Sequence, residues 1–150
     1  MIKTIEQEIQ QTKFKSPHQK AVINLIYTAN WLQSRQHAIF KPFGITGQQF
    51  NILRVLRGQF PKSISATELK SRMLDQNSDV SRLLDRLAGK KLAVKRTCPN
   101  DKRASDVFIT EEGISLLKEI DKRQKEIDTV LSLTPAEAEQ LSDLLDRCRQ

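Results

Sequence analysis

The sequence predicts a mainly α-helical protein with one small β-hairpin. Apolar residues recur every three or four positions over most of the 150-residue chain, which is the period of amphipathic helices. Only Leu92–Thr97, with its alternating side chains, and Asp106–Ile109 have the character of strands. Pro99-Asn100-Asp101 between them is typical of a turn. A chain of this length can bury a single core without disulfides or metals, so we expect one domain.

Two helices are expected before residue 44. The first, over residues 1–13, has a thin apolar stripe that needs a partner to pack against. Its members are Ile2, Ile5 and Ile9. The second is expected to begin at Pro17 and to continue to about Phe40, where the sequence Lys41-Pro42-Phe43-Gly44 breaks the pattern.

Three capping boxes indicate where later helices begin. In each, a hydroxyl residue is followed three positions later by a Gln or Glu that can reach back to the backbone. The pairs are Thr46 with Gln49, Ser65 with Glu68, and Thr134 with Glu137. We therefore expect a helix that ends near Gly58, a short helix over about 66–73, and a C-terminal helix after Pro135.

A further short helix is expected from about Asn77 to Ala88, with apolar residues on one face and polar residues on the other. Gly89 is a candidate for the left-handed residue that ends it. Thr110 is expected to cap a long helix that continues to about Leu131.

Two short helices joined by a tight turn and followed by a hairpin predict a winged helix-turn-helix. The polar face of the second helix can enter the DNA major groove, and a basic hairpin tip can follow phosphates or enter a narrow minor groove. The candidate DNA-binding residues are Asn77, Ser78, Ser81, Arg82, Arg86, Lys102 and Arg103. Arg82 can serve either a guanine or a phosphate, and Asp101 is expected to orient Arg103. The alternative is a solvated face on which Asp79 and Asp85 pair with Arg82.

The charge distribution favours an acidic partner. The chain has a net charge of +7, and residues 70–103 carry ten bases and four acids, whereas residues 111–150 carry six bases and ten acids. Residues 1–69 are also basic, with nine bases and three acids, but the positive charge is densest on the segment that contains the predicted helix-turn-helix and hairpin.

Several motifs in order resemble the MarR family of bacterial transcriptional regulators. The motifs are Thr46–Phe50 with Ile52-Leu53, Ser65–Leu69, Val80–Leu87, Asp101–Arg103 and Ile109–Gly113. Each is weak by itself, but their order and spacing are specific. The matching stretch runs from about Ile45 to Gly113, and the flanking helices are compatible in position and length.

The resemblance implies a homodimer whose dimerisation helices lie in about residues 1–43 and 114–150, and a winged helix-turn-helix DNA-binding lobe in about 45–112. It implies that Arg103 enters the minor groove with Asp101 as its supporting acid. A two-fold dimer is expected to bind double-stranded DNA with a pseudo-palindromic operator. The family also implies a repressor that releases DNA when a small effector, often aromatic or anionic, binds between the dimer base and the lobe.

Two residues depart from the family pattern. Lys91 stands where the family usually has a glycine before the first hairpin strand, so Gly89 is expected to shape that turn instead. The N-terminal helices lack the cysteine of the family's thiol sensors. A redox switch at Cys98 is an alternative, although only Lys95 and Arg96 are near it in sequence to lower its pKa.

An effector pocket is expected around the end of the second helix, where aromatic residues accompany one arginine and one histidine. The residues are Tyr27, Trp31, Arg35, His37, Phe40 and Phe43. The alternative is that Trp31, Phe40 and Phe43 belong to the core or the dimer contact.

No arrangement of nucleophile and base, phosphate-binding loop or metal-ligand cluster is visible, so we expect neither catalysis nor a metal or cofactor. Two cysteines without metal-type spacing, and the lack of a signal peptide or membrane-length apolar run, predict a cytoplasmic protein. The sequence therefore predicts a dimeric DNA-binding regulator. The alternative is a winged-helix protein-interaction module that does not bind DNA.

Overall fold

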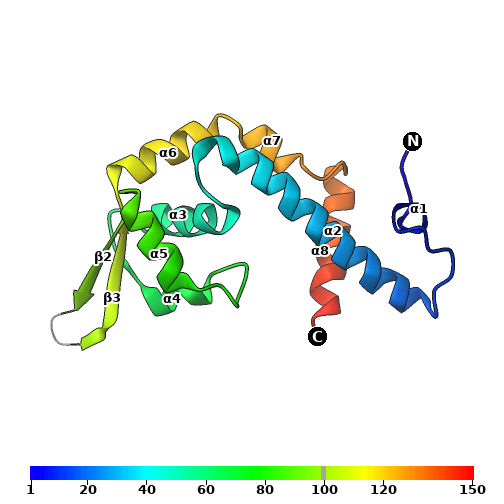
Figure 1. The fold of residues 1–150 in the computed structure, drawn as a ribbon, viewed down its shortest axis with the longest axis horizontal. Helices are drawn as coiled ribbons and strands as arrows, with labels where there is room; N and C mark the ends of the chain where they lie inside the picture. The colour runs from blue at the N-terminus through cyan, green and yellow to red at the C-terminus, as the bar shows by residue number, and fades with distance from the viewer. Residues whose placement is uncertain (99–100) are drawn as a thin grey trace.

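The structure is a computed structural model that describes residues 1–98 and 101–150, with the backbone alone at residues 98 and 101–104. It confirms a mainly helical chain with a small antiparallel sheet (Figure 1). The elements are α1 (Ile5–Glu8), α2 (Pro17–Phe40), the 3₁₀ helix η1 (Lys41–Phe43), α3 (Gly47–Gln59), β1 (Ile64–Ser65), α4 (Ala66–Ser71), α5 (Val80–Gly89), β2 (Ala93–Cys98), β3 (Asp101–Ile109), α6 (Glu111–Asp121), α7 (Gln124–Asp128) and α8 (Pro135–Cys148).

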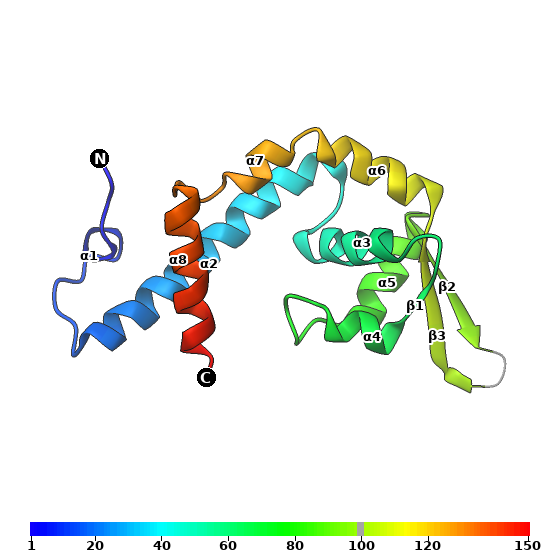
Figure 2. The same cartoon turned by 180° about the vertical axis from the view of Figure 1, so that it is seen from behind.

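The elements form an arch. A lobe made of α3 to α6 and the sheet lies at one end, and α2 leads away from it to the other end (Figures 1 and 2). There α8 crosses α2, and α1 lies beyond the first turn of α2. No helix in the described part of the chain is long and apolar enough to cross a membrane.

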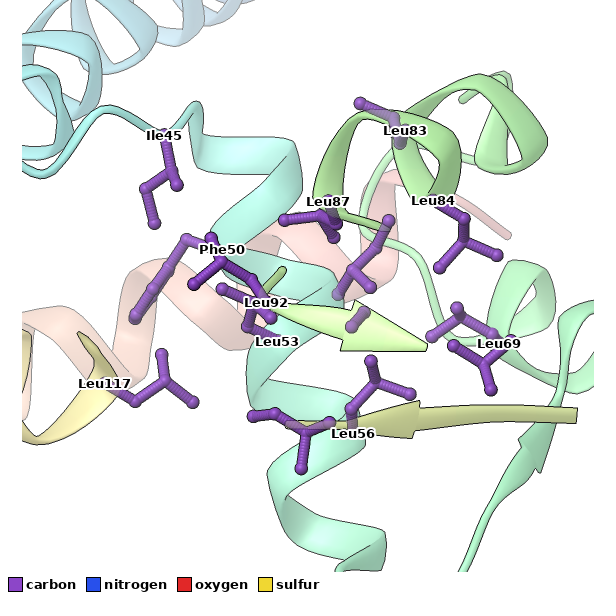
Figure 3. Packing of buried hydrophobic residues seen from close by; sticks show 14 of the residues in the cluster. Ile45, Phe50, Leu53, Leu56, Leu69, Leu83, Leu84, Leu87, Leu92 and Leu117 are labelled. Atoms are coloured by element: carbon purple, nitrogen blue, oxygen red, sulfur yellow. The ribbon is translucent and has the colours of Figure 1, made fainter. Parts of the chain in front are cut away.

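The core lies in the lobe, around α3. Ile52 and Leu53 are completely buried and Leu56 nearly so, because α3 is covered by α5 on one side and by α6 on another (Figure 3). The cluster extends through α5, α6 and the sheet by way of Leu69, Leu84, Leu87, Val107, Leu117 and Ile120. Each fully buried leucine or isoleucine stabilises the lobe by about 1.5–3 kcal/mol through removal of apolar surface from water.

The hairpin belongs to a three-stranded sheet in the order β1-β3-β2. Sequence analysis missed β1, whose Ile64 lies opposite Val107 and is buried. It also placed the start of the second hairpin strand at residue 106, whereas β3 begins at residue 101. A two-residue strand has too short a pattern to be recognised, since it exists through its pairing with β3.

The predicted helix starts at Thr46 and Thr134 are confirmed as reciprocal capping boxes. Thr46 Oγ1 accepts from Gln49 N at 3.1 Å, and Gln49 Oε1 accepts from Thr46 N at 3.1 Å. The box at Ser65 is only half formed. Ser65 Oγ accepts from Glu68 N at 3.1 Å, but the Glu68 carboxylate pairs with Arg72, one turn along α4, at 2.7 Å.

The N-terminal helix is much shorter than predicted. Gln10 takes a left-handed φ of 55° just past the end of α1, and only Ile5 of the three isoleucines is buried. A salt bridge from Lys20 of α2 to Glu6 holds α1 in place. The hydrogen bond from Lys20 is the main cause that lowers the pKa of Glu6 to about 2.

The predicted long helix after Thr110 is two helices, α6 and α7. The chain turns at residues 122–123, where Arg123 donates to the carbonyl of Ile39 at 3.4 Å and to the Glu126 carboxylate at 2.8 Å. This contact with the end of α2 stabilises a break in the helix, although the apolar stripe continues through it. The chain also turns differently after α5. Lys91, not Gly89, takes the left-handed φ of 61°.

Candidate nucleic-acid interface

Helix α5 begins three residues later than predicted, at Val80. Its N-cap is Asp79, whose Oδ1 accepts from Arg82 N at 3.1 Å. One face is buried in the lobe and consists of Val80, Leu83, Leu84 and Leu87. The opposite face is exposed and consists of Ser81, Arg82, Asp85 and Arg86. The 3.6-residue period thus gives one helix both a core face and a polar face with two arginines.

The arginines of this face are available to a ligand. Among the described side chains, no carboxylate lies within 4.0 Å of the guanidinium nitrogens of Arg82 or Arg86 in an ion pair. Asp79 instead caps the backbone of its own helix. The alternative in which Asp79 and Asp85 neutralise Arg82 is therefore not what the structure adopts.

The two predicted contact residues before α5 differ in exposure. Asn77 is exposed, and its backbone N–H donates to Asp75 Oδ1 at 2.9 Å. Ser78 is only 4% exposed, and its Oγ accepts from Gln48 Nε2 at 3.4 Å. Placing Ser78 on the polar face of the helix was wrong, because it lies in the turn before the helix and packs against α3.

The hairpin lies beside α5, since β2 follows it through the short turn at Lys91. Arg96 is exposed on β2, and its guanidinium lies 5.0 Å from the centre of the Phe108 ring. Sequence analysis gave Arg96 no DNA role, although its alternation in a basic strand marks it as a surface residue. The side chains of Asp101, Lys102 and Arg103 lie outside the described part of the structure, as does that of Cys98.

The residues expected to form an effector pocket are not brought together. Phe40 is buried and stacks on Phe50 with ring centres 4.4 Å apart, so it belongs to the core as the alternative held. Phe43 packs against the core beside Arg123. The Arg35 guanidinium lies 5.6 Å from the Trp31 ring on the surface of α2.

Nearer the start of α2, Tyr27 donates to Glu8 Oε2 at 3.0 Å, and this hydrogen bond raises the pKa of the Tyr27 hydroxyl. Of the six predicted pocket residues, only His37 borders a hollow of about 420 Å³ between α2, α3 and the segment before α5.

The helices α2 and α8, which form the arm of the arch, expose a large apolar surface together with the segment between α7 and α8. Only Ile39 and Phe40 of α2 are buried, and no residue of α8 is buried. The exposed apolar side chains are Val22, Leu25, Ile26, Tyr27, Trp31, Leu133, Leu141 and Leu144. Large apolar patches on a soluble protein mark contacts with another molecule.

Gln48 is a residue whose role the sequence did not reveal. It donates to Asp75 Oδ2 at 3.2 Å and to Ser78 Oγ, so it fixes the turn from which α5 begins. Nearby Asn51 accepts from Leu74 N at 3.0 Å. No local pattern signals these contacts, because they join residues 23 to 30 positions apart.

Known proteins share both the sequence pattern and the fold. A family model described as MarR family matches residues 43–104. The HTH-type transcriptional regulator MhqR of Bacillus subtilis (strain 168) is 27% identical over 106 residues, which are 69% of this chain and 72% of that protein.

Two solved structures extend the similarity over most of the chain. A MarR transcription factor from Planctomyces limnophilus is 29% identical with a TM-score of 0.68, and the match covers 89% of this chain and 98% of that one. BpsR of Bordetella bronchiseptica, described as regulated in DNA binding by 6-hydroxynicotinic acid, is 25% identical with a TM-score of 0.68 over 85% of this chain and 99% of its own. With a helix-turn-helix lobe, a hairpin wing and a helical arm in the same order, this chain is similar in sequence and in fold to the MarR family of transcriptional regulators.

Proposed function

We propose that the protein is a homodimeric, sequence-specific repressor that leaves its operator when a small molecule binds. The observation that carries this proposal is the exposed face of α5, where Arg82 and Arg86 form no ion pair with any described carboxylate. Because the other face of α5 is fixed in the core, these side chains project from a rigid helix. Arginine in the major groove can bind guanine bidentately or a phosphate singly.

The apolar surface of α2 and α8 supports a second copy of the chain as the partner. Five large side chains along α2 are between 37% and 58% exposed, an arrangement that a lone chain in water would not favour. A two-fold dimer through this surface would present two α5 helices to one side of a duplex. Its half-sites would then lie about 10–10.5 base pairs apart.

The hairpin would supply the second contact with DNA. Asp101, Lys102 and Arg103 belong to β3 by their backbone, and the exposed Arg96 adds a base on the neighbouring strand. We propose that Arg103 enters the minor groove with Asp101 as its orienting acid, and that Lys102 tracks the phosphates.

Release by an effector is supported by the similarity to BpsR, whose DNA binding is regulated by 6-hydroxynicotinic acid. It is also supported by the hollow beside Gln48, the residue that fixes the start of α5. A small molecule in that hollow would contact the connection on which the position of α5 depends.

The test compares Arg82→Ala and Arg86→Ala with Lys118→Ala on operator fragments selected from the source genome. Lys118 is exposed on α6, a different helix, and its replacement removes the same charge. We expect the α5 variants to weaken binding by roughly 1–3 kcal/mol where a base is read, and to reduce the salt dependence where a phosphate is contacted. If all three variants bind like the parent, α5 does not read DNA and a protein-interaction role becomes the better description.

A further inference from the structure

The hollow between α2, α3 and the α4–α5 connection has the size of a small-molecule site. Its volume is about 420 Å³, within the range of pockets that hold compact ligands. Both views show the α4–α5 connection close to the first turn of α3 (Figures 1 and 2), and residues of both segments and of α2 line the hollow. Three segments that are distant in sequence thus meet around one space.

The lining combines the apolar side chains of Met73 and Leu74 with polar side chains, and it contains one carboxylate. Amide groups surround the hollow from both helices, and His37 and Asp75 are its ionisable residues. The amide residues are Gln33, Gln36, Gln48 and Asn51. None of the described residues that border the hollow is a lysine or an arginine, although the whole chain has a net charge of +7. An anionic ligand would find no lysine or arginine in this lining, whereas a cation with N–H groups would find Asp75 and amide oxygens.

We propose that this hollow binds a small organic cation, an amine or an amidine, whose N–H groups donate to Asp75. The proposal refines the effector release described above and rests on it. The arginine near the predicted aromatic pocket does not change this conclusion, because Arg35 lies over Trp31 and does not line the hollow.

Binding of such a cation is coupled to α5 through Gln48. Gln48 Nε2 donates to Asp75 Oδ2 at 3.2 Å and to Ser78 Oγ at 3.4 Å, two residues of the turn that leads into α5. A ligand N–H that donates to Asp75 Oδ2 competes with Gln48 for the same acceptor. The turn then loses one of the two α3 side chains that hold it, since Asn51 remains bound to Leu74 N. The expected consequence is a lower affinity of α5 for DNA.

The test uses three probes of nearly equal shape, benzamidine, benzamide and benzoate, with the full-length protein and no DNA. Binding is followed through the side-chain amide signals of the lining residues in two-dimensional NMR. We expect the benzamidinium ion to shift these signals in the millimolar range, and benzoate to leave them unchanged. Benzoate binding as tight as benzamidine binding, or no shift with any probe, would overturn the proposal.

Two variants separate the carboxylate from general charge effects. Asp75→Asn keeps an oxygen that can cap Asn77 N, and it should weaken benzamidinium binding at least about fivefold while leaving benzamide binding unchanged. Glu112→Gln removes one exposed carboxylate outside the hollow and should change neither. Equal effects of the two variants would refute the role of Asp75.

A separate gel-shift series with benzamidine tests the coupling, with a rise in the apparent Kd for the operator as the expected result. An unchanged Kd despite saturation of the hollow would refute the coupling through Gln48. Because ligand binding is measured without DNA, a protein that fails to bind the cation but still binds its operator contradicts this inference alone. A protein that binds the cation but not DNA contradicts the proposed function instead.

Discussion

Gly113 is expected to be essential for packing α6 against the sheet, although alanine is the better helix former. A Cβ atom at this position would overlap the carbonyl oxygen of Leu92 and would lie 2.7 Å from Ile109 Cγ1. Leu92 O cannot move freely, since it accepts a hydrogen bond from Thr110 N at 3.2 Å. The Gly113 N–H is also fixed, because it donates to the N-cap Thr110 Oγ1 at 3.0 Å.

The magnitude follows from two opposing effects. Replacing an interior helix glycine with alanine stabilises a helix by about 1 kcal/mol. Forcing a methyl group into a filled space costs about 1–3 kcal/mol, and the upper end applies where the obstacle is a backbone atom. We therefore expect Gly113→Ala to lower the free energy of unfolding by about 1–2 kcal/mol.

Gly58→Ala is the matched control. Gly58 also lies inside a helix, α3, but it is exposed and a Cβ there would have no atom within 4 Å. Its replacement should raise the free energy of unfolding by about 0.5–1 kcal/mol. Urea unfolding followed by circular dichroism measures both variants at one protein concentration, because the stability of the proposed dimer would depend on concentration. If Gly113→Ala is as stabilising as Gly58→Ala, the close approach of α6 to the sheet is wrong.

Three other predictions concern stability and ionisation. Lys91→Gly should raise the free energy of unfolding by up to about 1 kcal/mol, because the left-handed φ of 61° is strained for a residue with a side chain but not for glycine. Urea unfolding measures the change, and a loss of stability would contradict the prediction. Phe40→Ala should lower the free energy of unfolding by about 3–5 kcal/mol, because it leaves a cavity where the ring packs on Phe50. If calorimetry shows a loss below about 1 kcal/mol, Phe40 does not belong to the core. The lowered pKa of Glu6 means that its salt bridge with Lys20 is complete above pH 4.5 and is lost as the pH falls through about 2. An NMR titration of the Glu6 carboxylate should show that midpoint, and Lys20→Met should raise it towards 4.5, because the hydrogen bond from Lys20 is the largest of its causes. An unchanged midpoint in the variant would exclude Lys20 as the cause.

The parts of the fold that could be predicted are those governed by local interactions. Thr46 and Thr134 begin helices because their hydroxyl groups and the residues three positions later satisfy free backbone groups within one turn. The buried face of α5 follows from its period alone. Where a side chain had a second possible partner, the local rule failed, as at Glu68, which pairs with Arg72 instead of its own N-cap.

Two other failures involve contacts between residues distant in sequence. The break between α6 and α7 depends on the carbonyl of Ile39, which lies 84 positions before Arg123. The burial of Ser78 depends on Gln48, 30 positions earlier. The expectations of a dimer and of a DNA surface came from the resemblance to a family. The expectation that Gly89 shapes the turn was wrong, because Lys91 takes the left-handed conformation at the position where the family usually has a glycine.

Helix α2 belongs to both parts of the proposed mechanism, and this determines how the two DNA-binding lobes would be spaced. Its exposed apolar side chains lie between Val22 and Trp31, whereas its last two residues, Ile39 and Phe40, are buried in the lobe. The Arg123 guanidinium ties the α6–α7 turn to the same end of α2, and Arg57 of α3 pairs with Asp121 at 2.8 Å. A dimer formed through the first half of α2 would therefore set the distance between the two α5 helices through a continuous helix. Only the α4–α5 turn, held by Gln48 and Asn51, would then be free to move α5 without moving the dimer contact.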